Sequence, residues 1–218
     1  MKKENAFTLV EILVVIAVTS VLLLILTQIF FSSLRGNNKA QALALIKQNS
    51  QSVLDSMDKS IRNADNIVCP AVAIGATSAT ANTLVIVKNG IFTRYRFRNV
   101  KSDLCPNTSF DQTLTNGELD RDTPVQDLKD PNQQNINNFI KFNLCNEQDP
   151  LQIPTLTRVT DNSVLGVSAT CGVFTRDKPK GFKDVVTIDF KLSPGVELSK
   201  KTFGQIDPVS FRTSVELR

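Results

Sequence analysis

Residues 12–31 read ILVVIAVTSVLLLILTQIFF, twenty consecutive residues without a charge. A helix rises about 1.5 Å per residue, so this stretch would span about 30 Å, the thickness of the hydrocarbon core of a bilayer. Many of its residues are β-branched, but a backbone in lipid must satisfy its own hydrogen bonds, which favours a helix. The run ends in QIFF rather than at a small-residue cleavage site. The sequence therefore predicts a retained transmembrane anchor over residues 12–31 and not a secretory signal peptide.

The composition of the 218 residues excludes several classes of enzyme. The chain has 25 Lys and Arg against 21 Asp and Glu, and it contains no His. Without His there can be no Ser-His-Asp or Cys-His nucleophile, and the commonest ligand of catalytic zinc and non-haem iron is missing. The formal net charge of +4 is too small to indicate nucleic acid as the main partner. We therefore expect a protein without catalytic residues and without a cofactor.

Four cysteines lie beyond the apolar stretch, at spacings of 36, 40 and 26 residues: Cys69, Cys105, Cys145 and Cys171. None forms a CxxC pair, and zinc and redox sites usually place their ligands closer together. The even number favours two disulfide bonds in an oxidising compartment, with free buried thiols as the alternative. Three pairings are possible, and chain order suggests Cys69 with Cys105 and Cys145 with Cys171.

The orientation of the anchor follows from these cysteines rather than from flanking charge. Lys2 and Lys3 precede the apolar stretch and Arg35 and Lys39 follow it, so the positive-inside count is nearly a tie. If the cysteines form disulfides, the C-terminal part of the chain lies outside the cytoplasm.

Glu11 is a charged residue inside the apolar N-terminal region, between FTLV and ILVV. A carboxylate costs about 2.5–3.5 kcal/mol near the centre of a bilayer and less near its surface. Glu11 either marks the edge of the membrane span or requires a partner of opposite charge.

The first 26 residues, MKKENA followed by FTLVEILVVIAVTSVLLLIL, combine a short basic leader, a small residue before Phe and a single intramembrane Glu. This segment resembles the N-terminus of type IV prepilins and of the pseudopilins of type II secretion. The resemblance implies that a prepilin peptidase removes residues 1–6 by cutting between Ala6 and Phe7, and that the new amine of Phe7 is methylated. The residue before the cut is usually Gly in that family, and Ala6 departs from this pattern.

The same resemblance implies a mechanism of assembly and a set of partners. The ammonium group of Phe7 would neutralise Glu11 of a neighbouring subunit when subunits dock. The implied partners are prepilin peptidase, other pilins or pseudopilins, a platform protein, an assembly ATPase and the membrane. The implied location is the bacterial inner membrane, with a single pass and an extracytoplasmic head, followed by the filament.

Beyond the anchor the sequence predicts one helix over about residues 7–66 and then a β-rich head over residues 67–218. Apolar and small residues recur at intervals of three and four, which is typical of a helix that packs on a sheet: Leu43, Ile46, Ser50, Val53, Met57, Ile61 and Ala64. Asn89-Gly90 predicts a hairpin turn between two strands. Further strands are expected at residues 139–144, 164–167, 185–192 and 210–217, and residues 107–138 are expected to be mostly loop. The predicted class is α+β, a pilin-like long helix on an antiparallel sheet.

Two groups of charged residues in the head are candidates for binding. Arg94, Arg96 and Arg98 alternate along one strand, so they share a face that either contacts nucleic acid or is the ordinary solvated face of a one-sided sheet. An acidic run could hold calcium or be a solvated loop, and it consists of Asp120, Asp122, Asp127 and Asp130. With a single tyrosine and no tryptophan the chain offers no base-stacking platform, so DNA is not favoured as a partner.

The expected function is that of a minor pilin or pseudopilin, a non-enzymatic subunit that assembles through its N-terminal helix. Two alternatives remain at this stage. One is an uncleaved single-pass protein whose head is a receptor or sensor. The other is a tip adhesin or a pilin for DNA uptake.

Overall fold

The computed structural model describes residues 8–98, 116–130, 133–146, 156–160, 166–195 and 206–218. The chain divides into two compact units, Met1–Gln41 and Ala42–Arg218. Cys105, Ala6 and Phe7 lie outside the described residues.

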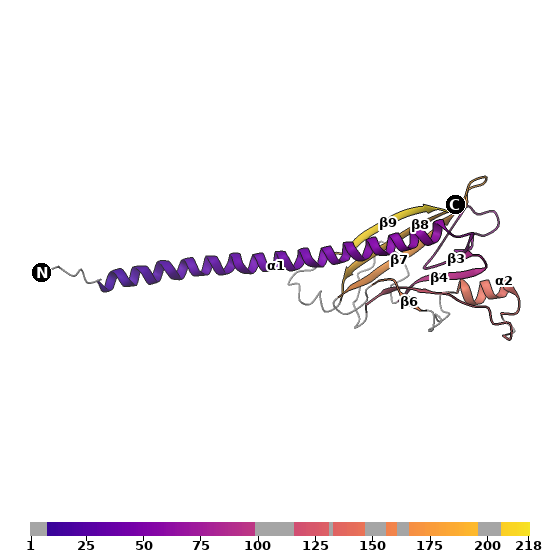
Figure 1. Ribbon diagram of the computed structural model, residues 1–218. Coiled ribbons are helices and arrows are strands. Elements are labelled where there is room, and N and C mark those ends of the chain that lie inside the picture. Colours follow the sequence, from indigo (N-terminus) through magenta and orange to yellow (C-terminus); the bar gives the residue numbers. More distant parts are fainter. Residues whose placement is uncertain (1–7, 99–115, 131–132, 147–155, 161–165, 196–205) are drawn as a thin grey trace. The chain divides into compact units, whose positions relative to one another are not determined.

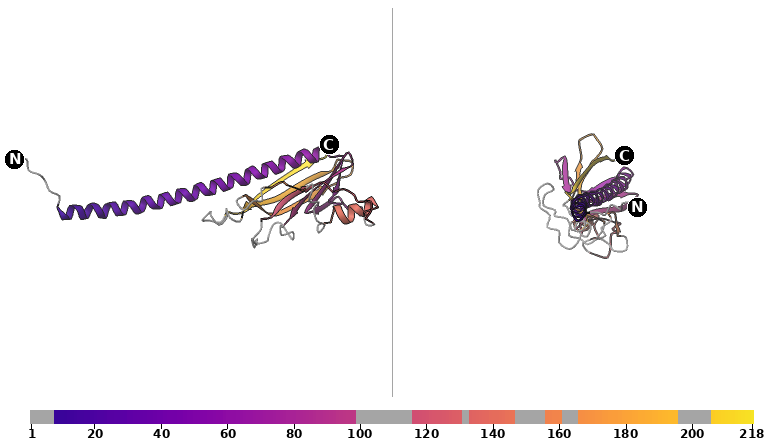
Figure 2. Two further views of the ribbon diagram at one scale, coloured as in Figure 1. Left: turned by 60° about the horizontal axis from the view of Figure 1, so that its bottom comes forward. Right: turned by 90° about the vertical axis from the view of Figure 1, so that its left-hand side faces the viewer.

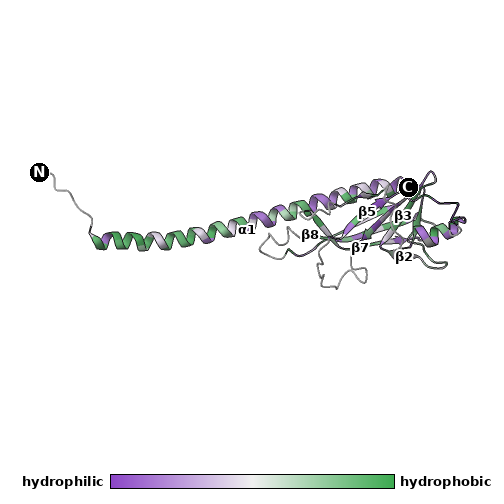
Figure 3. Cartoon of the chain, turned by 90° about the horizontal axis from the view of Figure 1, so that it is seen from below, coloured by the Kyte–Doolittle hydropathy of each residue, from purple (hydrophilic) through white to green (hydrophobic). Residues whose placement is uncertain are grey.

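The first unit consists, where it is described, of the N-terminal part of helix α1, Leu9–Arg62 (Figure 1). Every described residue up to Gln41 is exposed. This part of the helix is mostly apolar, as the green ribbon in Figure 3 shows. The helix passes Gly36 without a break, and its bounds confirm the predicted single long helix.

The remainder of α1 belongs to the second unit, the head, and one stripe of it is buried there. The buried stripe consists of Ala42, Ile46, Ser50, Val53, Met57 and Ile61. The stripe is the one expected from the sequence except at its start, where Ala42 is buried and Leu43 only partly so. Ala64, just beyond the helix, is buried as predicted. Lys47 and Gln51, on the opposite side, are exposed.

Two antiparallel sheets complete the head (Figure 1). The first has the order β1-β3-β4-β5-β6, and its strands are β1 (Asn66–Cys69), β3 (Thr83–Lys88), β4 (Ile91–Arg98), β5 (Glu118–Asp122) and β6 (Thr157–Arg158). The second has the order β2-β7-β8-β9, and its strands are β2 (Ser78–Ala81), β7 (Val167–Asp177), β8 (Val185–Pro194) and β9 (Val209–Glu216). The α+β class is confirmed, with two sheets rather than one.

The main hydrophobic core joins the C-terminal part of α1 to both sheets, and Figure 2 shows this part of the helix running along the sheets. Ile46 and Met57 of the helix meet Leu84 of the first sheet and Phe190 of the second in this core. The hydroxyl of Tyr95 on β4 donates a hydrogen bond to Ser60 Oγ of α1, at 2.8 Å. Burial of these side chains is the main stabilising term in the head, because each removes apolar surface from water.

Phe97 of β4 packs tightly against β7 of the other sheet. Its ring stacks on Phe174 of β7 with centroids 5.0 Å apart, and it lies over Gly172. A Cβ on Gly172 would lie 2.3 Å from the Phe97 ring, so only glycine leaves room for that ring.

Several local predictions are confirmed. Asn89 and Gly90 have φ angles of 49° and 75° between β3 and β4, as the hairpin turn requires. In β8, Val186, Ile188 and Phe190 are fully buried on one face, as the alternation predicts.

One prediction of local structure is incomplete and another is wrong. The range 107–138, expected to be mostly loop, also contains strand β5, which pairs with β4. Residues 139–144, expected to be a strand, follow the short helix α2 (Ile136–Asn138) as the π-helix η1 (Phe139–Leu144). Asn135 caps this segment, because its side chain accepts a hydrogen bond from Asn137 N at 2.8 Å.

A disulfide bond joins Cys69 of β1 to Cys145, just after η1. It closes a second, smaller core in which Phe139 and Leu144 pack on Val85 of β3. This bond contradicts both pairings suggested by chain order, because Cys69 and Cys145 pair with each other. Cys171 is also disulfide-bonded.

Gly172→Ala should lower the stability of the head by about 1–3 kcal/mol, because the added methyl group overlaps the Phe97 ring. Thermal unfolding of the full-length chain in detergent, followed by the fluorescence of its single tyrosine, the buried Tyr95, measures this loss. Gly36→Ala is the matched control, since its Cβ would meet nothing within 4 Å and should leave the transition unchanged. An unfolding transition of Gly172→Ala equal to that of the wild type would contradict the packing described here.

Candidate functional site

Glu11 lies in the first turn of α1 and forms a capping box with Thr8. The backbone N–H of Thr8 donates to Glu11 Oε2 at 3.4 Å, and the backbone N–H of Glu11 donates to Thr8 Oγ1 at 3.3 Å. The sequence T-x-x-E is typical of a capping box, and our sequence analysis missed this signal. Glu11 thus helps to begin the helix within its own chain, whatever else its charge does.

The surroundings of Glu11 are apolar and have no cover within the described part of the first unit. Leu9, Val10 and Leu13 are 76%, 69% and 60% exposed. Glu11 is the only ionisable residue from Leu9 to Leu34. α1 is the one described helix that is long and apolar enough to cross a membrane. An apolar helix surface of this size is stable only against lipid or against other apolar helices, and the helix therefore fits a membrane anchor.

The three candidate arginines of β4 face acidic residues of β5 across the sheet. The register pairs Arg94 with Asp122, Arg96 with Asp120 and Arg98 with Glu118. The complementary alternation R-x-R-x-R and E-x-D-x-D is present in the sequence, and it was the available signal for pairing these two strands. We refer to these six residues as the charged ladder.

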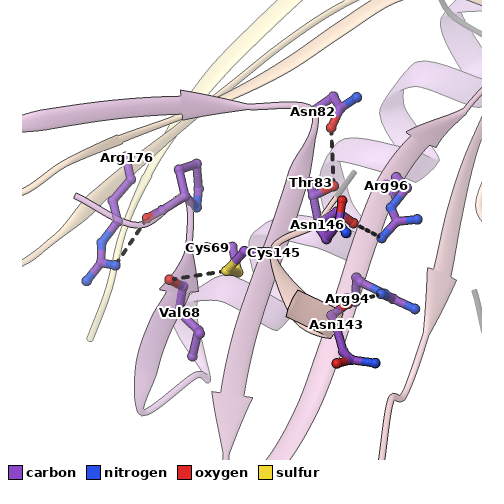
Figure 4. The surroundings of a disulfide bond; sticks show 11 residues. Val68, Cys69, Asn82, Thr83, Arg94, Arg96, Asn143, Cys145, Asn146 and Arg176 are labelled. Carbon is purple, nitrogen blue, oxygen red and sulfur yellow. Dashed lines mark hydrogen bonds between the residues drawn. A yellow bond between two sulfur atoms is a disulfide. The ribbon is translucent and has the colours of Figure 1, made fainter. Parts of the chain in front are cut away.

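Arg94 is fully buried at the inner end of the charged ladder. Its Nε and Nη2 donate to the two carboxylate oxygens of Asp122 at 3.0 and 2.8 Å. Its Nη1 donates to the carbonyl of Asn143 at 2.7 Å, and Arg96 Nη2 donates to the carbonyl of Asn146 at 2.8 Å. Figure 4 shows both arginines beside the Cys69–Cys145 disulfide.

These contacts correct the predicted environment of the arginines. Arg94 and Arg96 are 0% and 3% exposed, because residues 139–146 cover this face of the first sheet. The arginines hold that segment on the sheet, so Arg94 and Arg96 do not form a surface for nucleic acid. The sequence analysis inferred a solvated or DNA-binding face from the alternation of the arginines, and it did not foresee that residues 139–146 cover that face.

Asp120, which lies opposite Arg96 in the middle of the ladder, has a pKa well above its ordinary value. Arg98 donates from Nε to Asp120 Oδ2 and from Nη2 to Glu118 Oε1, each at 2.7 Å. Asp120 is fully buried, and its Oδ1 accepts no hydrogen bond. Burial, reinforced by the charge of Glu118, raises the pKa of Asp120 to about 6 despite the neighbouring Arg98.

The acidic run that was a candidate for calcium is divided between two elements. Asp120 and Asp122 belong to β5 and pair with arginines. Asp127 and Asp130 lie in the following loop, where Asp127 Oδ1 accepts from Lys129 N and Asp130 Oδ2 accepts from Gln133. Among the described residues, no group of three or more Cys, Asp and Glu is arranged to hold a metal ion.

Asp120→Asn should change how the stability of the head depends on pH. The folded protein holds a proton on Asp120 up to about pH 6, whereas the unfolded chain releases it near pH 4, so the contribution of Asp120 to stability falls as pH rises between these values. The stability of the wild type relative to Asp120→Asn should therefore fall by about 1–3 kcal/mol from pH 4 to pH 7. Urea unfolding, followed by the fluorescence of Tyr95, measures this difference in stability. Asp55→Asn, at an exposed carboxylate of α1, should follow the wild type at every pH, and equal pH dependence of Asp120→Asn and wild type would refute the burial argument.

Comparison with known proteins finds one similarity, at the N-terminus. Residues 1–27 match the family model described as the prokaryotic N-terminal methylation motif. No curated protein and no solved structure matches the chain. The matched segment contains Glu11 and the start of the exposed apolar helix. With this motif, a long N-terminal apolar helix and antiparallel sheets, the chain fits a type IV pilin-like protein.

Proposed function

We propose that the protein is a non-catalytic minor pilin or pseudopilin that is cut by a prepilin peptidase and assembles through its N-terminal helix. The observation that carries this proposal is the methylation motif at residues 1–27 together with the N-terminal part of α1, in which every apolar residue up to Gln41 is exposed. Lipid covers such a surface before assembly, and the helices of neighbouring subunits cover it afterwards.

Processing at Ala6–Phe7 supplies the charge that the carboxylate of Glu11 needs. Cleavage turns the amide nitrogen of Phe7 into an ammonium group, one residue before the Thr8 cap. In a filament the helices exclude water, and an unpaired carboxylate there costs several kcal/mol. The ammonium group of one subunit therefore pairs with Glu11 of the next and fixes their axial register.

The disulfide bond between Cys69 and Cys145 supports an extracytoplasmic head, because such bonds persist in oxidising compartments. The proposed orientation has the leader in the cytoplasm and the head on the far side of the inner membrane. The proposed partners are prepilin peptidase, other pilins or pseudopilins, a platform protein and an assembly ATPase. Whether the filament is a surface pilus or a secretion pseudopilus depends on those partners.

The mature protein should lack residues 1–6 and begin with methylated Phe7. Intact-mass and N-terminal peptide mass spectrometry of the membrane-bound protein tests this. Ala6→Gly should be cut at least as completely, because it keeps a small residue at the cleavage position, whereas Ala6→Leu should accumulate as precursor. An uncut wild-type chain in cells that cleave their other prepilins would contradict the proposal and favour an uncleaved receptor or sensor.

Glu11→Gln should insert in the membrane normally but enter filaments at least tenfold less than the wild type, since it removes the charge that an assembled ammonium group pairs with. Sheared filaments and membranes compared by immunoblot give this ratio.

Thr8→Ala is the matched control for this variant. It breaks the same capping box, at a cost of about 1 kcal/mol to the helix, and keeps the carboxylate. Equal incorporation of Glu11→Gln and the wild type, or equal losses for Glu11→Gln and Thr8→Ala, would mean that Glu11 serves only to cap the helix.

A further inference from the structure

Two neighbouring loops of the head expose apolar side chains that do not take part in either hydrophobic core. One loop, residues 70–77, joins β1 to β2, and the other, residues 178–184, joins β7 to β8. They are adjacent because β2 pairs with β7, with Ser78 opposite Asp177, and Lys178 N donates to the carbonyl of Thr77 at 2.8 Å. Both lie near the end labelled C in Figure 1.

The first loop is uncharged and mostly apolar. Residues 70–77 read PAVAIGAT, and no ionisable residue follows before Lys88. Ala71, Ala73 and Ala76 are exposed, and Ile74 projects fully into solvent at 108%. An isolated exposed Ile is ordinary, but a run of apolar residues standing clear of the surface marks a contact site.

The second loop combines a projecting aromatic ring with positive charge. Residues 178–183 read KPKGFK, and Phe182 is 79% exposed. Lys178, Lys180 and Lys183 are exposed around it, and the turn at Gly181 has a φ of +79°, which favours glycine. Among the large apolar residues described in the head, Ile74 and Phe182 have the two highest exposed fractions.

A buried arginine fixes the bases of both loops. Arg176 Nε donates to Asp184 Oδ2 at 2.8 Å, and its Nη1 donates to the carbonyl of Pro70 at 3.3 Å, as Figure 4 shows for Pro70. The ion pair with Arg176 neutralises Asp184. Residues 176–184 contain four basic and two acidic side chains, and the three basic side chains other than Arg176 are lysines that face solvent around Phe182. The bases of the two loops are thereby held beside each other.

We propose that the loops 70–77 and 178–183 form a binding surface for an anionic lipid membrane. Ile74 and Phe182 enter the boundary between headgroups and acyl chains, and the three lysines contact lipid phosphates. Apolar tips ringed by lysines have the chemistry of proteins that lie on such membranes. None of these residues belongs to helix α1, so the surface is distinct from the proposed membrane anchor.

The composition of the two loops favours lipid over the other polyanions. Nucleic acid would be matched by arginines and several stacked aromatic rings, but Phe182 is the only aromatic residue in these loops, and the whole loop beside it is uncharged. A protein partner would usually meet hydrogen-bonding groups at the centre of the interface, and residues 71–76 offer none in their side chains.

The test uses the full-length protein inserted in phosphatidylcholine nanodiscs, so that the anchor is already occupied. Binding in trans is measured by flotation with vesicles of phosphatidylcholine that contain phosphatidylglycerol, and with pure phosphatidylcholine vesicles. The variants are Lys178→Gln/Lys180→Gln/Lys183→Gln and Ile74→Ser/Phe182→Ser. Their matched controls are Lys39→Gln/Lys47→Gln/Lys59→Gln, at exposed lysines of α1, and Val125→Ser/Leu128→Ser, at exposed apolar residues of another loop.

The wild type should bind the anionic vesicles and not the neutral ones. Removal of each loop lysine should weaken binding to anionic vesicles about fivefold, because a lysine near the lipid surface contributes about 1 kcal/mol. Added salt should also weaken this binding, since it screens the charges. Ile74→Ser/Phe182→Ser should also lose binding, and both controls should bind like the wild type.

Three results would overturn the proposal. The first is the absence of binding to anionic vesicles, and the second is equal loss in the loop variants and their controls. The third is binding that depends on the lysines but not on Ile74 and Phe182 and that a DNA oligonucleotide or an acidic peptide abolishes, because a polyanion other than lipid would then be the ligand.

Discussion

The structure depends on one requirement: the exposed apolar surface of α1 must be covered, and the described residues of its own unit do not cover it. From Leu9 to Leu34 the helix exposes one large hydrophobic side chain after another, and nothing in the described part of its own unit packs on them. Water is not a stable environment for such a surface, so it requires lipid or other helices. Glu11 makes the requirement more specific, since a lone carboxylate is poorly suited to either environment unless a positive charge accompanies it. The match of residues 1–27 to the N-terminal methylation motif fits this, because the proposed cleavage between Ala6 and Phe7 would create an ammonium group close to Glu11.

In the head, different interactions hold the two sheets and the C-terminal part of α1 together. The main core does this by apolar burial, and Phe97 of one sheet lies directly over Gly172 of the other. On the outer face of the first sheet, the disulfide between Cys69 and Cys145 and the hydrogen bonds from Arg94 and Arg96 hold residues 139–146 in place. Buried ion pairs of this kind contribute modestly to net stability but are costly to break singly, so they favour one arrangement of the segment over others.

Periodic elements were predictable from the sequence, and contacts between distant segments were not. The stripe along α1, the Asn89-Gly90 turn and the alternation in β8 each follow from local spacing, and all three are present. The π-helix at Phe139–Leu144 was missed because its residues have no helical period of their own and owe their shape to the Asn135 cap and to packing on Val85. The burial of Arg94 was missed as well, because the sequence analysis did not place this segment over the face of the sheet that carries Arg94. Disulfide connectivity is a property of the folded topology, so chain order gave the wrong pairs. Two signals were present and unused, the T-x-x-E cap at Thr8 and the complementary charges of β4 and β5.

The central claim is that the exposed face of α1 passes from a lipid environment to a protein environment. A photo-crosslinking amino acid placed at Leu13, which is 60% exposed and close to Glu11, reports its neighbours directly. The account predicts lipid adducts in membranes before assembly and adducts to other pilin-like chains in assembled material. If the probe yields lipid adducts alone in cells that make filaments, the helix is a simple anchor and the account is wrong.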